Sequence, residues 1–247
     1  MKLIETFKSP NFNERVANQQ LRHIILHYTA MESCKDALEH VCYKKNKVSS
    51  HFLISKNGDI FYLVDIKKRA WHAGESYWKG LQDLNSSSIG IEIDNSGHHI
   101  YNEDYNHLQI ESLCELIKKL SVDYNILSKN ILGHSDIAPF RKIDPGEKFP
   151  WQTLNQKKLS YFPKIYTKNI ELKSNKAETN YEYRENQYAL SILNSIGYDT
   201  RNVNVNDNKF KLLIEAYQRH YRQSNITGEI DRETIILIKK HYKDMLT

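Results

Sequence analysis

The pattern of apolar and polar residues divides the chain into a strand-rich first part and a helical last part. In the first part, four short apolar runs predict β-strands, over residues 24–28, 51–55, 60–64 and 89–93. The asparagine–glycine pair at 57–58 predicts the turn of a hairpin, and leucines at helical spacing predict an amphipathic helix over 108–120. We therefore expect an α/β fold with a mixed central β-sheet flanked by helices.

The last part of the chain has a different pattern. Residues 164–184 are polar and lack periodicity, which indicates a linker or a surface segment. Beyond them, three helices are predicted by apolar residues at helical spacing, over 188–196, 210–221 and 234–242. We expect a catalytic domain over 1–164, a linker over 165–182 and a small three-helix domain over 183–247.

Length and composition narrow the class of protein. A chain of 247 residues can bury a full core and carry a second, smaller domain. No apolar run approaches the roughly 20 residues that span a bilayer, so we expect no transmembrane segment. The net charge of +5 is spread along the chain, so nothing favours a nucleic-acid partner.

The expected compartment follows from the cysteines and from the first residues. Three cysteines are too few, and odd in number, for a disulfide framework, and they indicate reduced thiols. The first ten residues lack the apolar core of a secretory signal. We expect a cytoplasmic location, with the periplasm or cell envelope as the alternative.

Three side chains have the chemistry of a catalytic zinc site. His134 and Asp144 lie ten residues apart around a stiff loop, and His27 ends an apolar run that predicts a buried strand. A zinc ion with three protein ligands and one open position is the catalytic arrangement. The sequence therefore predicts a metallohydrolase that binds Zn²⁺ through His27, His134 and Asp144.

Two further side chains fit catalytic roles. Glu92 interrupts an apolar strand with a carboxylate, which is costly to bury unless the group has a partner or a task as a general base. Because Asp144 precedes a proline, its backbone is expected to be extended, so Lys142 and Asp144 face the same site. Lys142 could then stabilise negative charge that develops on a carbonyl oxygen.

Each of these residues also has an ordinary structural interpretation. His27 could be a hydrogen-bonded core histidine, Asp144 a turn residue, Lys142 a solvated cation and Glu92 a partner of a lysine. Their joint occurrence favours the catalytic interpretation. Four more histidines are candidates, and turn chemistry predicts that the last two are exposed to solvent: His51, His72, His98 and His99.

The order and spacing of several motifs over residues 20–155 resemble the zinc-dependent N-acetylmuramoyl-L-alanine amidases. The motifs are His27-Tyr28-Thr29, Ser50-His51-Phe52-Leu53-Ile54, Asn57-Gly58, Trp71-His72-Ala73-Gly74, Ser88-Ile89-Gly90-Ile91-Glu92, Gly133-His134-Ser135-Asp136-Ile137-Ala138-Pro139 and Lys142-Ile143-Asp144-Pro145-Gly146.

This resemblance implies roles for the candidate residues. His27, His134 and Asp144 would be the zinc ligands, Glu92 the acid/base and Lys142 the transition-state stabiliser. The substrate would be peptidoglycan or a muropeptide, cut between the lactyl group of N-acetylmuramic acid, or its 1,6-anhydro form, and L-alanine. Ser50 stands where several relatives place a tyrosine near the metal, so no catalytic role is expected at that position.

The last 65 residues resemble the three-helix peptidoglycan-binding domain, in segments such as 193–198 and 227–234. We expect this domain either to hold polymeric wall or only to buttress the catalytic domain. Two other functions are considered. A non-catalytic muropeptide receptor would typically lack a zinc ligand, and a glycosidase would need a second isolated carboxylate beside Glu92.

Overall fold

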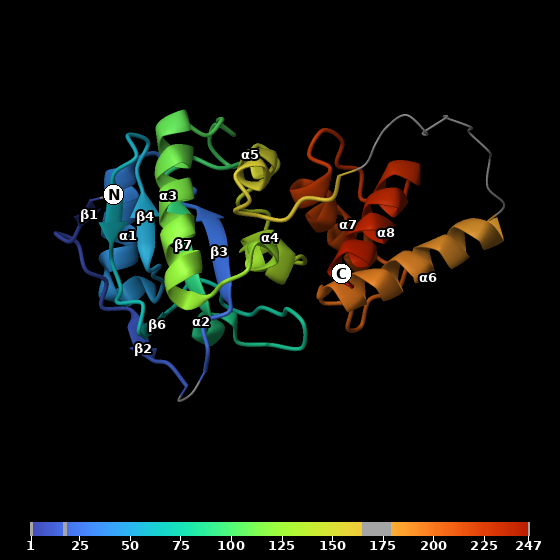
Figure 1. The fold of residues 1–247 in the computed structure, drawn as a ribbon, viewed down its shortest axis with the longest axis horizontal. Coiled ribbons are helices and arrows are strands. Elements are labelled where there is room, and N and C mark those ends of the chain that lie inside the picture. The colour runs from blue at the N-terminus through green and yellow to red at the C-terminus, as the bar shows by residue number, and fades with distance from the viewer. Residues whose placement is uncertain (1, 17–18, 165–178, 247) are drawn as a thin grey trace.

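We analysed a computed structural model, which describes residues 2–16, 19–164 and 179–246 (Figure 1). A six-stranded mixed sheet forms the centre of the first part, in the order β1-β5-β4-β7-β3-β8. The strands are β1 (Leu3–Ile4), β3 (His23–Tyr28), β4 (Phe52–Ile54), β5 (Ile60–Tyr62), β7 (Ser88–Ile93) and β8 (Ile131–Gly133). The predicted strands and the hairpin turn between β4 and β5 are confirmed.

Two short strands, β2 (Phe12–Glu14) and β6 (Lys68–Ala70), form a separate antiparallel pair. The first part also has helices of one to five turns, which pack around the sheet (Figure 1). They are α1 (Cys34–Cys42), α2 (Leu84–Ser87), α3 (His107–Tyr124), α4 (His134–Ile137) and α5 (Trp151–Gln156), with the 3₁₀ turns η1 (Lys44–Asn46) and η2 (Ser128–Asn130). The mixed α/β fold predicted from the sequence is confirmed.

Strand β3 lies between β7 and the edge strand β8, and it is buried on both faces. Successive side chains of a strand point to opposite sides, so β3 contributes to two cores. Ile24 and Leu26 pack in the core beneath α3, whereas Ile25 lies in the other core with Leu132 of β8. By the same alternation, His27 lies on the face of Ile25. The parallel neighbours β7 and β8 pair directly with β3, so the carboxyl ends of the three strands meet at one edge.

Three helices form the last part of the chain, α6 (Thr179–Ile196), α7 (Asn208–Tyr221) and α8 (Arg232–Met245), and the three-helix prediction is confirmed (Figure 1). Helix α6 begins at Thr179, so the last four residues of the predicted linker or surface segment, 179–182, are helical. The first half of this helix, 179–187, is polar apart from two tyrosines, of which Tyr183 is exposed, so no apolar stripe there could reveal the helix in the sequence. The rest of the predicted linker, 165–178, lies outside the described residues.

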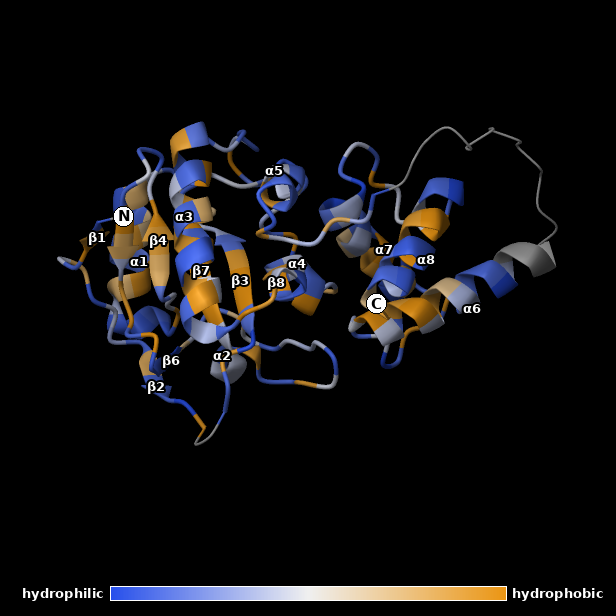
Figure 2. Cartoon of the chain, viewed as in Figure 1, coloured by the Kyte–Doolittle hydropathy of each residue, from blue (hydrophilic) through white to orange (hydrophobic). Residues whose placement is uncertain are grey.

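The bundle shares a hydrophobic core with the first part of the chain. Ile25, Trp78 and Ile137 of the first part belong to the same buried cluster as Leu193 and Tyr198 of the last part. The Trp78 and Tyr198 rings meet edge to face with centroids 4.9 Å apart. Figure 2 shows the apolar stripes of α6 to α8, which supply the bundle's share of this core. Each such buried large side chain contributes roughly 1.5–3 kcal/mol, so the bundle stabilises the first part directly.

Within the part of the chain that the structure describes, no helix has the length and apolarity to cross a membrane.

Candidate metal centre

Three elements bring His27, His134 and Asp144 together. His27 is the penultimate residue of β3, and His134 follows β8 as the first residue of α4. Because Leu26 is the register partner of Gly133, the two histidines emerge at the same edge of the parallel strands. Ligand sites of open α/β sheets lie at this carboxyl edge. The loop after α4 then returns Asp144 to the same place.

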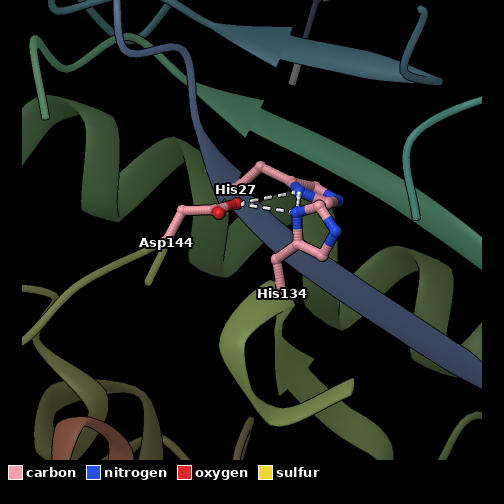
Figure 3. Close-up of side chains that lie close together, drawn as sticks. All are labelled: His27, His134 and Asp144. Carbon is pink, nitrogen blue, oxygen red and sulfur yellow. Dashed lines mark hydrogen bonds and ion pairs between the residues drawn. The ribbon is translucent and has the colours of Figure 1, made fainter. Parts of the chain in front are cut away.

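The potential ligand atoms converge, as Figure 3 shows. Nδ1 of His27 lies 3.0 Å from Nδ1 of His134 and 3.1 Å from Oδ2 of Asp144, and Nδ1 of His134 lies 3.0 Å from the same Oδ2. All three residues are buried. Zinc bonds of about 2.0–2.1 Å in a tetrahedron place ligand atoms about 3.3 Å apart, so this spacing fits zinc.

The backbone fixes the tautomer of His134. Nε2 of His134 lies 3.1 Å from the carbonyl oxygen of Ala73, which can only accept a hydrogen bond. Nε2 therefore carries the proton, and Nδ1 presents a lone pair to the centre. Arg141 also donates from Nη2 to the Ala73 oxygen, at 2.5 Å, and so holds that carbonyl in place.

A chain of hydrogen bonds fixes the tautomer of His27 in the same way. Ser88 donates its hydroxyl to the carbonyl oxygen of Leu84, so Ser88 Oγ accepts from Nε2 of His72 at 3.2 Å. Nδ1 of His72 is then the acceptor for Nε2 of His27, at 3.1 Å, and Nδ1 of His27 keeps its lone pair. Gly90 leaves room for this relay, because a Cβ there would lie 2.6 Å from Cδ2 of His72.

Three acceptors therefore face one another in a buried site. Burial, followed by the nearby His134, lowers the pKa of His27 to about 4, so this imidazole is neutral at pH 7. Burial opposes ionisation of Asp144, but its contacts with the two histidines hold the pKa of the carboxyl below its usual range. Two imidazole lone pairs and a carboxylate repel one another unless a cation lies between them.

Glu92 and Lys142 lie beside this cluster. Glu92 on β7 is the register partner of His27, and among the described residues its buried Oε2 has no hydrogen-bond partner. Burial, followed by the negative charge of Asp144, raises the pKa of Glu92 well above its usual value, and Lys142 opposes this shift. Lys142 also lowers the pKa of His27, as the last of several causes, so its charge acts on the same centre.

The other candidate histidines have separate roles. His99 is exposed as expected, but the exposure predicted for His98 is wrong. Nε2 of His98 lies 2.8 Å from Oε2 of Glu147, and Tyr28 contacts Nδ1, so partners distant in sequence half-bury the ring. His51 lies outside the cluster and accepts from the backbone N–H of Gly90 at 3.0 Å.

The sequence did not identify the groups that hold the two histidines. His72 was a candidate without a role, whereas Arg141, Ser88 and the carbonyl of Ala73 had no signal of their own. The tetrapeptide Trp71-His72-Ala73-Gly74 contributes two of these four groups, so this motif was the available clue.

The geometry has counterparts in known proteins. A family profile described as N-acetylmuramoyl-L-alanine amidase matches residues 17–147. The chain belongs to this family. It is 34% identical over 232 residues to the N-acetylmuramoyl-L-alanine amidase AmiD of Escherichia coli K12, which covers 89% of this chain and 82% of AmiD. It is 32% identical to the 1,6-anhydro-N-acetylmuramyl-L-alanine amidase AmpD of Haemophilus influenzae, over 59% of this chain and 86% of AmpD.

Solved structures extend the likeness to the helical bundle. AmiD of E. coli, solved with anhydro-N-acetylmuramic acid-L-Ala-D-γ-Glu-L-Lys, superimposes with a TM-score of 0.77 at 29% identity, covering 95% of this chain and 98% of AmiD. AmpDh3 of Pseudomonas aeruginosa superimposes with a TM-score of 0.79 at 28% identity, covering 99% of this chain and 100% of AmpDh3.

These matches confirm the predicted family and reaction. The chain is an enzyme that hydrolyses the amide bond between the lactyl group of N-acetylmuramic acid and L-alanine of the stem peptide. Its substrate is peptidoglycan or a muropeptide. The N-acetylmuramoyl-L-alanine amidase family thus accounts for both the motifs and the fold.

Proposed function

We propose that this amidase is zinc-dependent, with His27, His134 and Asp144 as the ligands. The observation that supports the proposal is the convergence of two imidazole lone pairs and one carboxylate oxygen within 3.1 Å of one another. Imidazole and carboxylate are common zinc ligands, and three of them leave a fourth position open for the reaction. When bound, zinc supplies a Lewis acid that polarises the amide carbonyl and makes water more acidic.

Glu92 is the proposed proton carrier. Its buried Oε2 has no hydrogen-bond partner in the described part of the chain, and the pKa of the carboxyl is raised. The carboxyl can therefore take a proton from the attacking water and later release it. The proton goes to the amine of L-alanine, which leaves as a neutral group. The ammonium of Lys142 stabilises the oxyanion that forms on the lactyl carbonyl.

The zinc proposal is tested by removing metal from the full chain and adding it back. After treatment with a chelator, the protein is expected to lose amidase activity and to recover it with one equivalent of Zn²⁺. Full activity of the metal-free protein would overturn the proposal.

The preferred sugar is the anhydro form of muramic acid. AmiD and AmpDh3 were both solved with anhydromuramyl peptides, and both cover nearly all of this chain. Mass spectrometry of the products from matched anhydro and non-anhydro muropeptides tests this preference. Faster release of peptide from the non-anhydro substrate would contradict it.

The rival function, a receptor that binds muropeptides without cutting them, has less support. Such a receptor needs neither an acid/base nor a complete ligand set, yet both sets of side chains are present here. Release of new amines from a muropeptide separates the two functions, because a receptor releases none.

For the compartment, we propose the cytoplasm, with the cell envelope as the alternative. Cys34, Cys42 and Cys114 are all free thiols, which suits a reducing compartment. A wall-holding bundle would favour the envelope. Labelling of the three thiols in intact and lysed cells distinguishes these locations, because an impermeant reagent reaches an envelope protein before lysis.

A further inference from the structure

Helix α4 carries a second buried polar group, which the proposed chemistry does not use. Asp136 is fully buried, two residues after His134. Its Oδ2 accepts a hydrogen bond from the backbone N–H of Gly133 at 2.7 Å, so this carboxylate closes the turn in which His134 lies.

The other donors to Asp136 come from the C-terminal bundle. Tyr198, just after α6, donates its hydroxyl to Oδ1 at 2.7 Å. His220, on α7, lies with Nδ1 2.7 Å from Oδ2. The His220 ring is stacked between Trp151 and Tyr221, with centroids 3.6 and 3.9 Å away, so its donor has a fixed direction.

The same turn fixes two of the proposed metal ligands. His134 begins α4, and the backbone N–H of Ser135 donates to the carbonyl oxygen of Asp144 at 2.9 Å. Gly133 packs tightly against the same loop, because a Cβ there would lie 2.7 Å from Cδ of Pro145. A shift of this turn would therefore move His134 and Asp144 together.

We propose that Tyr198 and His220 are positioning residues for the metal centre. They hold the carboxylate of Asp136, and through residues 133–136 they fix His134 and Asp144. The inference rests on the proposed zinc function. If one of these donors is removed, the buried carboxylate of Asp136 loses a hydrogen bond. It then shifts towards another donor, and the turn of residues 133–136 moves with it. Metal sites tolerate displacements of only about 0.5 Å before affinity falls.

The test compares two tyrosines of the same core. Tyr198→Phe removes one hydroxyl that bonds Asp136, whereas Tyr217→Phe removes a buried hydroxyl that has no hydrogen-bond partner among the described residues. The zinc dissociation constant of each full-length variant is measured by competition with a chelator, at a temperature where circular dichroism shows both fully folded. We expect about 10-fold weaker binding for Tyr198→Phe and no change for Tyr217→Phe.

A second pair of variants isolates the donor on α7. His220→Asn keeps an N–H near the position of Nδ1, and His220→Leu does not. Asparagine is expected to retain more zinc affinity than leucine, and the visible spectrum of the cobalt-substituted site should change only for leucine. A role in stability alone would lower the melting temperature of both variants and leave affinity and spectrum unchanged.

Two results would overturn the inference, and they are distinguishable. Tyr198→Phe and His220→Leu that bind zinc as tightly as Tyr217→Phe would reject the positioning role and leave the zinc function intact. A wild-type protein that binds no zinc would reject the proposed zinc function and this inference with it.

Discussion

Two buried clusters of histidine and aspartate meet at α4, one through His134 and one through Asp136, and the same residue types play different parts in them. At His27, His134 and Asp144, three acceptor atoms converge within 3.1 Å. At Asp136, a carboxylate is surrounded by donors from Gly133 and the bundle. The balance of donors and acceptors, rather than residue type, distinguishes the two: the first cluster could hold a cation, whereas the second is a structural contact.

The largest expected effect is the loss of zinc binding and activity, which we expect for a substitution in the first cluster and not in the second. His134→Ala removes a proposed ligand and should abolish zinc binding, with a loss of activity of more than about 10³-fold, because the metal supplies several kcal/mol. Asp136→Asn should keep one equivalent of zinc at saturating metal and lower the free energy of unfolding by roughly 3 kcal/mol. Metal analysis and urea unfolding measure both quantities. Full zinc stoichiometry in His134→Ala would remove that residue from the ligand set.

Glu92 sharpens the comparison within the first cluster, because it lies beside the proposed ligands and is not one of them. Glu92→Gln should keep zinc and substrate binding but lose turnover by roughly 10²–10⁴-fold. Steady-state kinetics on a soluble muropeptide measures the loss, with the exposed Glu111→Gln as the control. Near-native turnover in Glu92→Gln would place the proton carrier elsewhere.

A smaller effect on zinc affinity is expected for His72, which acts on the centre only through its hydrogen bond to His27. His72→Gln breaks the relay that holds the tautomer of His27, and zinc affinity should fall about 10–100-fold. The matched control is His23→Gln, because His23 is equally buried on β3 but makes no contact with the cluster. Competition with a chelator gives both constants. Equal affinities for the two variants would show that His72 only fills space.

The smallest expected effect is a pH dependence of the free energy of unfolding, which comes from a histidine of the bundle. Burial, followed by His220 and Lys79, lowers the pKa of His241 to about 3. The unfolded chain binds this proton below about pH 6.5, whereas the folded chain does not until about pH 3. The stability contributed by neutral His241 is therefore full above pH 6.5 and is lost as the pH falls towards 3.

Urea unfolding of the wild type and His241→Leu at pH 7 and pH 5 checks this sign. The wild type should lose roughly 2 kcal/mol more than the variant between these values. If both lose the same free energy, His241 is not buried in its neutral form.

Much of the fold and of the site was predictable because the signals were local. The apolar runs of β3 and β7 and the leucine stripe of α3 follow from burial. The short elements β1, β2 and β6 were not predicted, since two or three partly exposed residues carry no period. Likewise, the three proposed ligands had residue types and a spacing that could be recognised in the sequence.

The supports of the site could not be predicted, because they depend on contacts between distant residues. Tyr198 and His220 lie 62 and 84 residues from Asp136, and the carbonyl of Ala73 carries no side-chain signature. The exposure of His98 was predicted wrongly for the same reason, since Glu147 lies 49 residues away.

The position of β3 between β7 and β8 has a consequence for synthesis. This strand is made early, but its neighbours begin at Ser88 and Ile131, so both of its edges remain unpaired while most of the first part is translated. Strands that are far apart in the sequence pair slowly, and their apolar side chains stay exposed to solvent until they do. His27 thus leaves the ribosome long before His134 and Asp144 do. The turn of His134 gains its last donor only when α7 has been made, so the centre takes its final form near the end of translation.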